Sequence, residues 1–156
     1  MAVIKVAGTN VYAFDGTAVT KLICTTGIDL GSDSTSRIEN TCLEETQSRS
    51  YLNGLSDPAE GSLTFNLDPA NTTHLKLIEW AEDKKEGIQF YVGASDGTAD
   101  ITATGTTAVV PETRSWWSFI GGISTPVPSF DLDALVGYTV TLQRSTSVAF
   151  TPKTTP

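Results

Sequence analysis

His74 and the serine of the stretch GLSDP, residues 54–58, are the side chains of this sequence best suited to catalysis. An imidazole acts as a general base in a triad only where a nucleophile and an orienting acid converge on it. The GLSDP stretch lacks the closing glycine of the G-x-S-x-G nucleophile elbow, and the chain has no second histidine. His74 is therefore interpreted as an exposed or half-buried helix residue. A hydrolase built on His74 and a nearby carboxylate is the weaker alternative.

Acidic residues follow Asp29 in an order that invites comparison with a calcium-binding loop. Such a loop needs glycine at its sixth position and glutamate at its twelfth, where this chain has Ser34 and Asn40. The stretch GTADITATGTT, residues 97–107, contains neither phosphate-binding glycine motif. The sequence therefore predicts no metal, no other cofactor and no enzymatic activity.

The chain has ten Lys and Arg residues against eighteen Asp and Glu residues, a formal net charge of -8 at pH 7. Because nucleic-acid binding depends on cations that neutralise phosphates, this charge disfavours such a partner, and it also disfavours an anionic membrane. No apolar run is long enough for a signal peptide or a membrane span. We expect synthesis in a reducing cytosol, where Cys24 and Cys42 are separately buried thiols rather than a disulfide.

The elements that must position these residues are mostly strands, because short runs of apolar and polar residues alternate between turn signals. The sharpest run is GSLTFNLD, residues 61–68, where Leu63, Phe65 and Leu67 are expected to face a core. Further strands are expected within residues 3–14, 18–28, 37–43, 116–125 and 138–146. A hairpin is expected over residues 87–105, where Asp96-Gly97 is the turn. Loops are expected at 29–36 and 126–137, and a C-terminal tail at 146–156.

One helix is expected over residues 69–86. Asp68 can cap it, Pro69 suits its first turn, and Gly87 occupies the position of a left-handed stop. Its modest apolar stripe consists of Leu75, Leu77, Ile78 and Ala81. The pattern predicts a single, mainly β domain over residues 1–156, with two packed β-sheets (a sandwich or a partly closed barrel) and one flanking α-helix.

The stretch CLEETQSRSYLNGLSDPAEGSLTF, residues 42–65, begins with a polar segment that shows no obvious structure of its own. Loops of this length are uncommon in compact domains and usually signal function or disorder. Tyr51, Leu52 and Leu55 interrupt its polar composition, which argues against simple disorder. We expect this segment to order against a neighbouring copy of the same chain.

Residues 41–87, TCLEETQSRSYLNGLSDPAEGSLTFNLDPANTTHLKLIEWAEDKKEG, resemble the major tail tube protein of long-tailed, siphovirus-type bacteriophages. That family has a strand, a long polar loop with a tyrosine and a G-L-x-D step, a G-S-L-T-F type strand, and then an amphipathic helix with acidic ends. The stretch WWSFIGGISTPVPSFDLDALVGYTVTLQRST, residues 116–146, is similar to the closing hairpin of the family. The two segments together cover half of the chain.

The resemblance implies a fold shared with contractile-tail tubes and the type VI secretion tube, and hexameric rings that stack into a hollow tube for DNA ejection. It implies a place in the virion tail, with assembly in the cytoplasm of the host bacterium. It also implies a tape-measure protein, a tail terminator and a tail-tip initiator as partners. The long loop, Leu43 to Pro58, would reach the adjacent ring through Glu44, Glu45, Arg49, Tyr51, Leu52 and Leu55.

A bore that lets DNA pass without specific binding should be lined by small polar side chains and be poor in Lys and Arg. Two expected strands have such faces, and the lumen-facing candidates are Ser62, Thr64, Asn66, Asp100, Thr102 and Thr104. The alternative function is a β-sandwich binding module, an adhesin or a carbohydrate-binding domain, that uses Trp116 or Trp117. Since adjacent residues of a strand face opposite sides, one of these tryptophans is expected in the core and the other exposed or at an interface.

Overall fold

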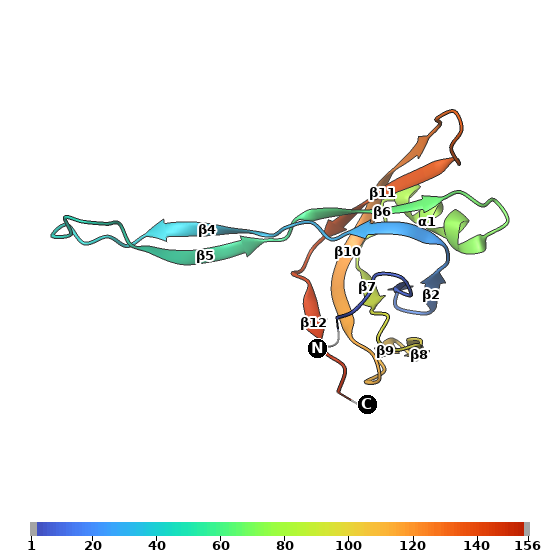
Figure 1. Cartoon of the computed structure of the whole chain (residues 1–156), viewed down its shortest axis with the longest axis horizontal. Helices are drawn as coiled ribbons and strands as arrows, with labels where there is room; N and C mark the ends of the chain where they lie inside the picture. The colour runs from blue at the N-terminus through green and yellow to red at the C-terminus, as the bar shows by residue number, and fades with distance from the viewer. Residues whose placement is uncertain (1–2, 155–156) are drawn as a thin grey trace.

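The computed structural model describes residues 3–154, which form twelve strands and one helix (Figure 1). The helix α1 spans Thr72–Glu82. The strands are β1 (Asn10–Phe14), β2 (Val19–Leu22), β3 (Thr25–Asp29), β4 (Ser34–Glu39), β5 (Tyr51–Asp57), β6 (Glu60–Asn66), β7 (Ile88–Gly93), β8 (Thr102–Thr104), β9 (Thr107–Val109), β10 (Trp116–Ser129), β11 (Gly137–Arg144) and β12 (Ala149–Thr151).

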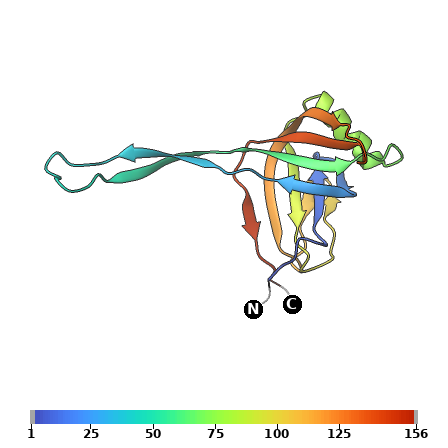
Figure 2. The same cartoon turned by 45° about the horizontal axis from the view of Figure 1, so that its top comes forward.

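The main sheet has eight strands in the order β2-β1-β7-β10-β11-β6-β3, with β12 paired to β10. The long strand β10 joins its two halves, because residues 116–121 pair with β7 and residues 121–129 pair with β11. Figure 2 shows β10 curving between them, so that β1 and β7 run across the direction of β6 and β3. The strand pairs β4-β5 and β8-β9 lie outside this sheet.

A hydrophobic core contains side chains from both halves of the sheet and from α1. Alternation along β6 sends Leu63 and Phe65 into this core, and both are fully buried. Helix α1 contributes Leu77 and Trp80 from its buried side. The other buried members are Val11, Ala13, Leu22, Ala81, Ile88, Phe90, Phe119, Ile123, Val140 and Leu142. The expected mainly β fold with a flanking helix is confirmed, and its two layers are the halves of one bent sheet.

A second, smaller cluster covers the opposite face of the β1-β7-β10 half. It is built from Tyr12, Ile101 and Trp116, and the Tyr12 and Trp116 rings meet edge to face with centroids 5.5 Å apart. Beside it lies Arg114, which is fully buried. The Arg114 guanidinium donates hydrogen bonds to the carbonyl oxygens of Gly8, Gly93, Ala94 and Ala99 and to Asn10 Oδ1. One cation thus ties the N-terminal segment to the end of β7 and to the loop that follows it.

Helix α1 is shorter than the expected range of 69–86. Its N-cap is Asn71, whose side-chain oxygen accepts a hydrogen bond from the Thr73 backbone N–H at 3.0 Å. Asp68 instead accepts from the Ala70 N–H in the preceding turn. The helix ends before Gly87, because Lys84 already adopts a left-handed backbone with φ 53°. Within residues 3–154 no helix is long and apolar enough to cross a membrane.

The expected hairpin over residues 87–105 is wrong. Strand β7 pairs with β1 and β10, and β8 pairs with β9. The alternation of Ile88, Phe90 and Val92 correctly indicates a buried strand, since all three side chains are buried. Alternation reports which face of a strand is buried and carries no information about the neighbouring strand.

Other boundaries differ more modestly. The expected strand at 3–14 begins only at Asn10, and the segment 18–28 divides into β2 and β3 at Cys24, which has φ 58°. The expected loop at 29–36 includes the start of β4, and the C-terminal tail includes β12, which pairs with the first residues of β10. Residues with positive φ form turns that interrupt these segments, although their composition is typical of a continuous strand.

Leu77→Ala is expected to lower the free energy of unfolding by about 2–5 kcal/mol, because it leaves a cavity at the centre of the core. Leu75 was expected in the apolar stripe, but it lies on the exposed side of the same helix, so Leu75→Ala should change the free energy of unfolding by about 0.5 kcal/mol or less. Urea denaturation followed by tryptophan fluorescence measures both. Equal effects of the two substitutions would contradict the assigned packing of α1.

Candidate assembly interface

The β4-β5 hairpin extends far from the body of the domain (Figures 1 and 2). All six residues of β4 are exposed, and in β5 Gly54 alone is half-buried. The segment 43–58 was expected to be a loop, but residues 51–57 form a strand, and its partner, residues 34–39, precedes the segment. Both faces of the hairpin meet solvent, so its sequence lacks the apolar alternation that identifies half-buried strands.

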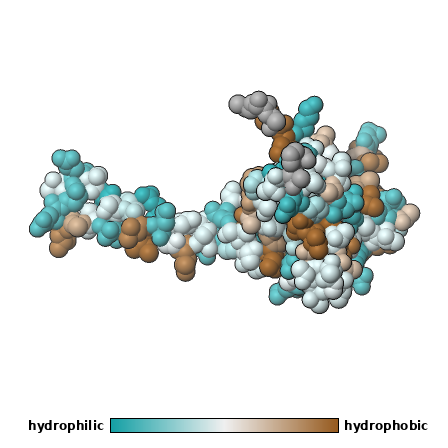
Figure 3. Space-filling view, turned by 90° about the horizontal axis from the view of Figure 1, so that it is seen from below, coloured by the Kyte–Doolittle hydropathy of each residue, from teal (hydrophilic) through white to brown (hydrophobic). Residues whose placement is uncertain are grey.

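Apolar side chains gather on one face of this hairpin. Ile38 and Leu52 are directly paired across the strands, so their side chains lie on the same face. Leu55 is 86% exposed, and Leu43, in the connecting loop, is fully exposed. Figure 3 shows the resulting apolar patches along one side of the projection. We call Ile38, Leu43, Leu52 and Leu55 the hairpin stripe.

A β-bulge brings Leu55 onto that face. Two residues of β5, Gly54 and Leu55, oppose Ser36 alone, because Thr35 pairs with Ser56 and Arg37 with Asn53. The shift places Leu55 on the side of Leu52 rather than on the opposite side. A Cβ on Gly54 would lie 2.2 Å from Ser36 Oγ, so a larger residue here would require the Ser36 side chain to rotate away.

The other expected contact residues lie on the opposite face or near the end of the hairpin. Tyr51 packs under the Arg37 guanidinium, whose carbon lies 4.0 Å from the ring centroid. Arg49 Nε is 3.7 Å from Glu39 Oε1 in a solvent-exposed pair. Glu44 and Glu45 lie in the connecting loop, where the backbone N–H groups of Gln47 and Ser48 lower the pKa of the Glu45 carboxyl.

Arg144, at the end of β11, holds the root of the hairpin. Its buried guanidinium donates to the Leu30 carbonyl at 2.7 Å and forms an ion pair with Asp33. Asp33 Oδ1 also accepts the Ala59 backbone N–H at 3.2 Å, so both strands of the hairpin are tied to one side chain. These hydrogen bonds, first that from Arg144 and then that from Ala59, lower the pKa of Asp33. Sequence reasoning missed Arg144, since nothing in its neighbourhood along the chain marks a distant partner.

The six lumen-facing candidates fall into two separate groups. Ser62, Thr64 and Asn66 share the face of β6 that points away from the core. Residues of β11 extend this polar sheet face, since Thr141 is paired with Ser62 and Thr139 with Thr64. We use the name polar sheet face for these five residues.

Asp100, Thr102 and Thr104 lie elsewhere, beside or within the small β8-β9 sheet. Asp100 accepts hydrogen bonds from the Tyr12 hydroxyl and, at 3.3 Å, from Lys21 Nζ. Burial, together with the hydrogen bond to Asp100, raises the pKa of Tyr12 to about 12, and the same hydrogen bond lowers the pKa of Asp100. Asp100 therefore has a structural contact inside the domain.

His74 is fully buried, so its expected exposure is wrong. The Asp68 backbone N–H donates to Nδ1 at 3.2 Å, which leaves Nε2 to donate to the Ile23 carbonyl at 2.7 Å. One ring nitrogen accepts while the other donates, which is the arrangement of a neutral imidazole. Both nitrogens are engaged by the fold itself, so this histidine is not available to a substrate.

The cysteines were expected to be buried, and both are exposed free thiols. Cys24 lies in the turn between β2 and β3, and Cys42 lies in the loop at the end of the hairpin. Within the described part of the chain no group of three or more His, Cys, Asp or Glu residues could hold a metal ion.

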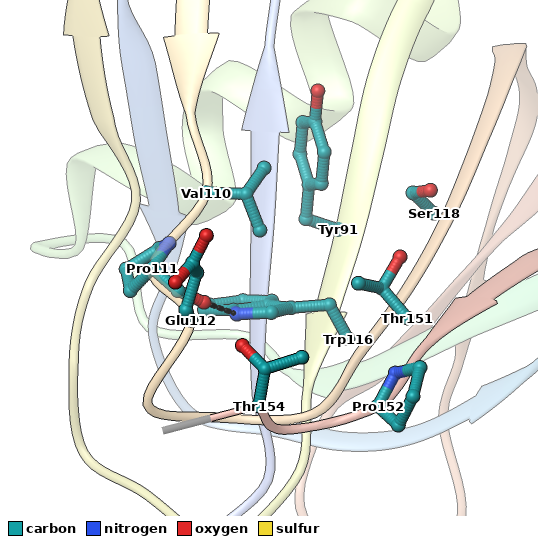
Figure 4. A pocket seen from close by; sticks show the side chains of 9 residues that line it. All are labelled: Tyr91, Val110, Pro111, Glu112, Trp116, Ser118, Thr151, Pro152 and Thr154. Carbon is teal, nitrogen blue, oxygen red and sulfur yellow. Dashed lines mark hydrogen bonds between the residues drawn. The ribbon is translucent and has the colours of Figure 1, made fainter.

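A pocket of about 250 Å³ lies between β7, β10 and the segment after β9 (Figure 4). Trp116 forms part of its wall, is 1% exposed and donates from Nε1 to the Pro111 carbonyl at 2.9 Å. Trp117 is half-buried against Phe150, with ring centroids 5.1 Å apart. Trp116 is in the core as expected, whereas Trp117 is half-buried rather than exposed. The Trp116 ring is buried and offers no open face that could stack on a sugar.

Comparison with known proteins agrees with this architecture. A family described as "Phage tail tube, TTP, lambda-like" matches residues 2–154. "Structural protein 3" of Pseudomonas phage PAJU2 is 32% identical over 160 residues, covering 98% of this chain and 96% of that protein. The fold is similar to a chain of the PVC sheath/tube terminator of an extracellular contractile injection system, with TM-score 0.65, 17% identity and coverage of 97% and 98%. It is also similar to a chain of the tail of an empty gene transfer agent particle, refined with C6 symmetry. The TM-score is 0.63 and the identity 14%, and the match covers 96% of this chain and 99% of that one. The SPP1 tail tube matches with a TM-score of 0.57 and 12% identity over 96% of this chain and 80% of that one.

Asp33→Asn is expected to lower the thermal unfolding midpoint near pH 7, because it removes the carboxylate that pairs with Arg144. The pKa of Asp33 is lower in the folded state than in the unfolded state. The ion pair therefore contributes to stability in full above the ordinary aspartate pKa of about 3.9, and this contribution is lost as pH falls through the lower folded pKa. The gap between the midpoints of the wild type and the variant should therefore close below about pH 4. Asp57→Asn, on β5 of the same hairpin, is the matched control. A gap that stays constant with pH would exclude the ion pair as its cause.

Proposed function

The chain belongs to the lambda-like phage tail tube family, and from this premise we propose how its copies assemble. It is a structural protein of the tail tube of a virion.

In the proposed assembly the β4-β5 hairpin makes the contact between successive rings. One observation carries this assignment: a two-stranded arm leaves the domain with every large apolar side chain on it exposed. An isolated hairpin is marginally stable at best in water, and exposed apolar patches mark interaction surfaces. Tyr51, Leu52 and Leu55 are the proposed anchors, with Glu44, Glu45 and Arg49 as polar contacts at the rim.

The polar sheet face is proposed to line the bore. Its five side chains are hydroxyls and one amide, so it offers DNA no cation to bind. Strand β3 is the last strand at one end of the sheet, so one of its edges is unpaired. Strand β10 has a second unpaired edge: on the side that faces away from β11, no strand among residues 3–154 pairs with it beyond Gly121. Such edges pair readily with another chain. Edge pairing between neighbours would join the faces into one continuous barrel.

We carry over six subunits per ring from the resemblance, and the matched gene transfer agent tail was refined with C6 symmetry. Ring contacts close by rotation, whereas stacking contacts are open-ended and make a filament. The proposed partners are a tail-tip initiator at one end, a tail terminator at the other and a tape-measure protein inside. Assembly takes place in the cytoplasm of the host bacterium, and DNA passes through the bore without specific binding.

In this proposal the chain works without enzymatic activity and without a cofactor. His74, the residue that a hydrolase would need, is engaged on both nitrogens by backbone groups. The binding-module alternative loses its support as well, because both tryptophans are packed against their own chain.

The purified, concentrated chain is expected to form hollow filaments or six-fold rings in negative-stain electron microscopy. Tyr51→Ala with Leu52→Ala should leave the domain folded, since both side chains lie on the hairpin and outside the core, and should block filament growth. Val109→Ala with Thr107→Ala, on exposed positions of β9, is the control that should still form filaments. Filaments of normal length from the hairpin variant would refute the assignment of the hairpin.

A gold cluster attached at residue 66 tests the lining of the bore. In a background with Cys24→Ser and Cys42→Ser, Asn66→Cys is labelled before assembly and the filaments are averaged. Density inside the lumen is the expected result, and density on the outer surface would remove the polar sheet face from the bore. Thr104→Cys tests the β8-β9 group in the same way.

A further inference from the structure

A second exposed apolar surface lies at the turn between β10 and β11. Phe130 is 76% exposed, Leu132 98% and Leu135 72%. Together with Ala134 and Val136 they line a shallow hollow of about 220 Å³. We call residues 130–136 the β10-β11 tip. Four large apolar side chains on a seven-residue turn exceed the scattered apolar exposure of an ordinary surface.

The hairpin and the β10-β11 tip leave the sheet at opposite ends. Strand β6 starts at the hairpin root, where Glu60 is paired with Gln143, and it ends where Asn66 is paired with Gly137. Gly137 directly follows the tip, so the tip lies at the end of the sheet that is farther from the hairpin. Figure 1 shows the hairpin on the left and the β10-β11 turn at the upper right.

We propose that the β10-β11 tip receives the hairpin stripe of the next copy along the tube. This inference rests on the proposed function, in which copies stack head to tail. In such a stack every copy has the same direction, so the projecting end of one copy faces the opposite end of the next. Two surfaces that are apolar and uncovered in the isolated chain are then brought together.

The character of the tip favours this occupant. From residue 115 to residue 143 the chain has two acidic residues, Asp131 and Asp133, and no Lys or Arg, which disfavours nucleic acid. The hollow is smaller than the cavities of 300–1,000 Å³ that hold small molecules, and it suits single apolar side chains. At the end of the hairpin Arg49 is paired with Glu39, and Glu44 and Glu45 lie in the same loop, so the contact rests on the apolar side chains and not on charge.

Native Cys42 allows a direct test, because it is an exposed thiol in the loop at the end of the hairpin. In a Cys24→Ser background, cysteine is introduced singly as Phe130→Cys, Leu132→Cys or Leu135→Cys. Assembled filaments are oxidised mildly and run on a non-reducing gel. Thr106→Cys, in the exposed turn between β8 and β9, is the matched control.

At least one tip variant should give a ladder of covalent dimers, trimers and longer chains, because each copy contributes one hairpin and one tip. Its yield should exceed that of Thr106→Cys by about tenfold or more, since disulfides form only where the two Cα atoms come within about 7 Å. The ladder should disappear on reduction. It should also be absent when Cys42→Ser is added.

Intact filaments in which no tip variant cross-links more than the control would overturn the proposal and leave the tube function standing. A background chain that forms no filaments would instead count against the proposed function, and this inference would fail with it. A second measurement avoids cysteine chemistry. Leu132→Asp with Leu135→Asp should leave six-fold rings but prevent their stacking, and filaments of normal length from this variant would also overturn the proposal.

Discussion

The β4-β5 hairpin cannot bury its apolar side chains against its own chain, and much of the molecule follows from this constraint. Its strands are exposed on both faces, so neither packing nor a third strand supports them. The isolated domain holds the hairpin through its root, where the buried Arg144 binds the Leu30 carbonyl and Asp33. An arm that is anchored firmly at one end and apolar along one face is suited to a surface on another molecule.

Two buried arginines give the domain the rigidity that this arrangement needs. Arg114 ties the N-terminal segment to the end of β7, and Arg144 ties the hairpin to β11. Guanidinium groups present several donors in a fixed plane, so each can satisfy carbonyl oxygens from segments that belong to no regular element. The Arg114 and Arg144 hydrogen bonds thereby connect irregular parts of the chain, including the root of the hairpin, to the sheet.

The sheet itself has a direction, with the hairpin at one end and the β10-β11 tip at the other. A subunit with unlike ends forms open-ended stacks rather than closed dimers. The net charge of -8 opposes premature association of free subunits, because like charges repel at a distance while the apolar contacts act only at short range. In the proposed assembly, the apolar contacts between rings and the charge that keeps free subunits apart therefore lie on different parts of the surface.

The sequence by itself determined the elements whose faces differ: the buried side of β6, the presence of α1 and the mainly β class were readable from the local spacing of apolar and polar residues, although the caps of α1 are not the expected Asp68 and Gly87. It also marked Tyr51, Leu52 and Leu55 as unusual in a polar segment, and its patterns indicated the family. Only the tertiary structure decided which strands are neighbours, because period-two alternation reports a buried face and not a partner. It likewise decided that residues 51–57 are a strand, that His74 is buried and that both cysteines are exposed, since these depend on contacts between segments far apart in the chain. The root of the hairpin is the clearest case: Arg144 and Asp33 are separated by 111 residues, and only folding brings them together.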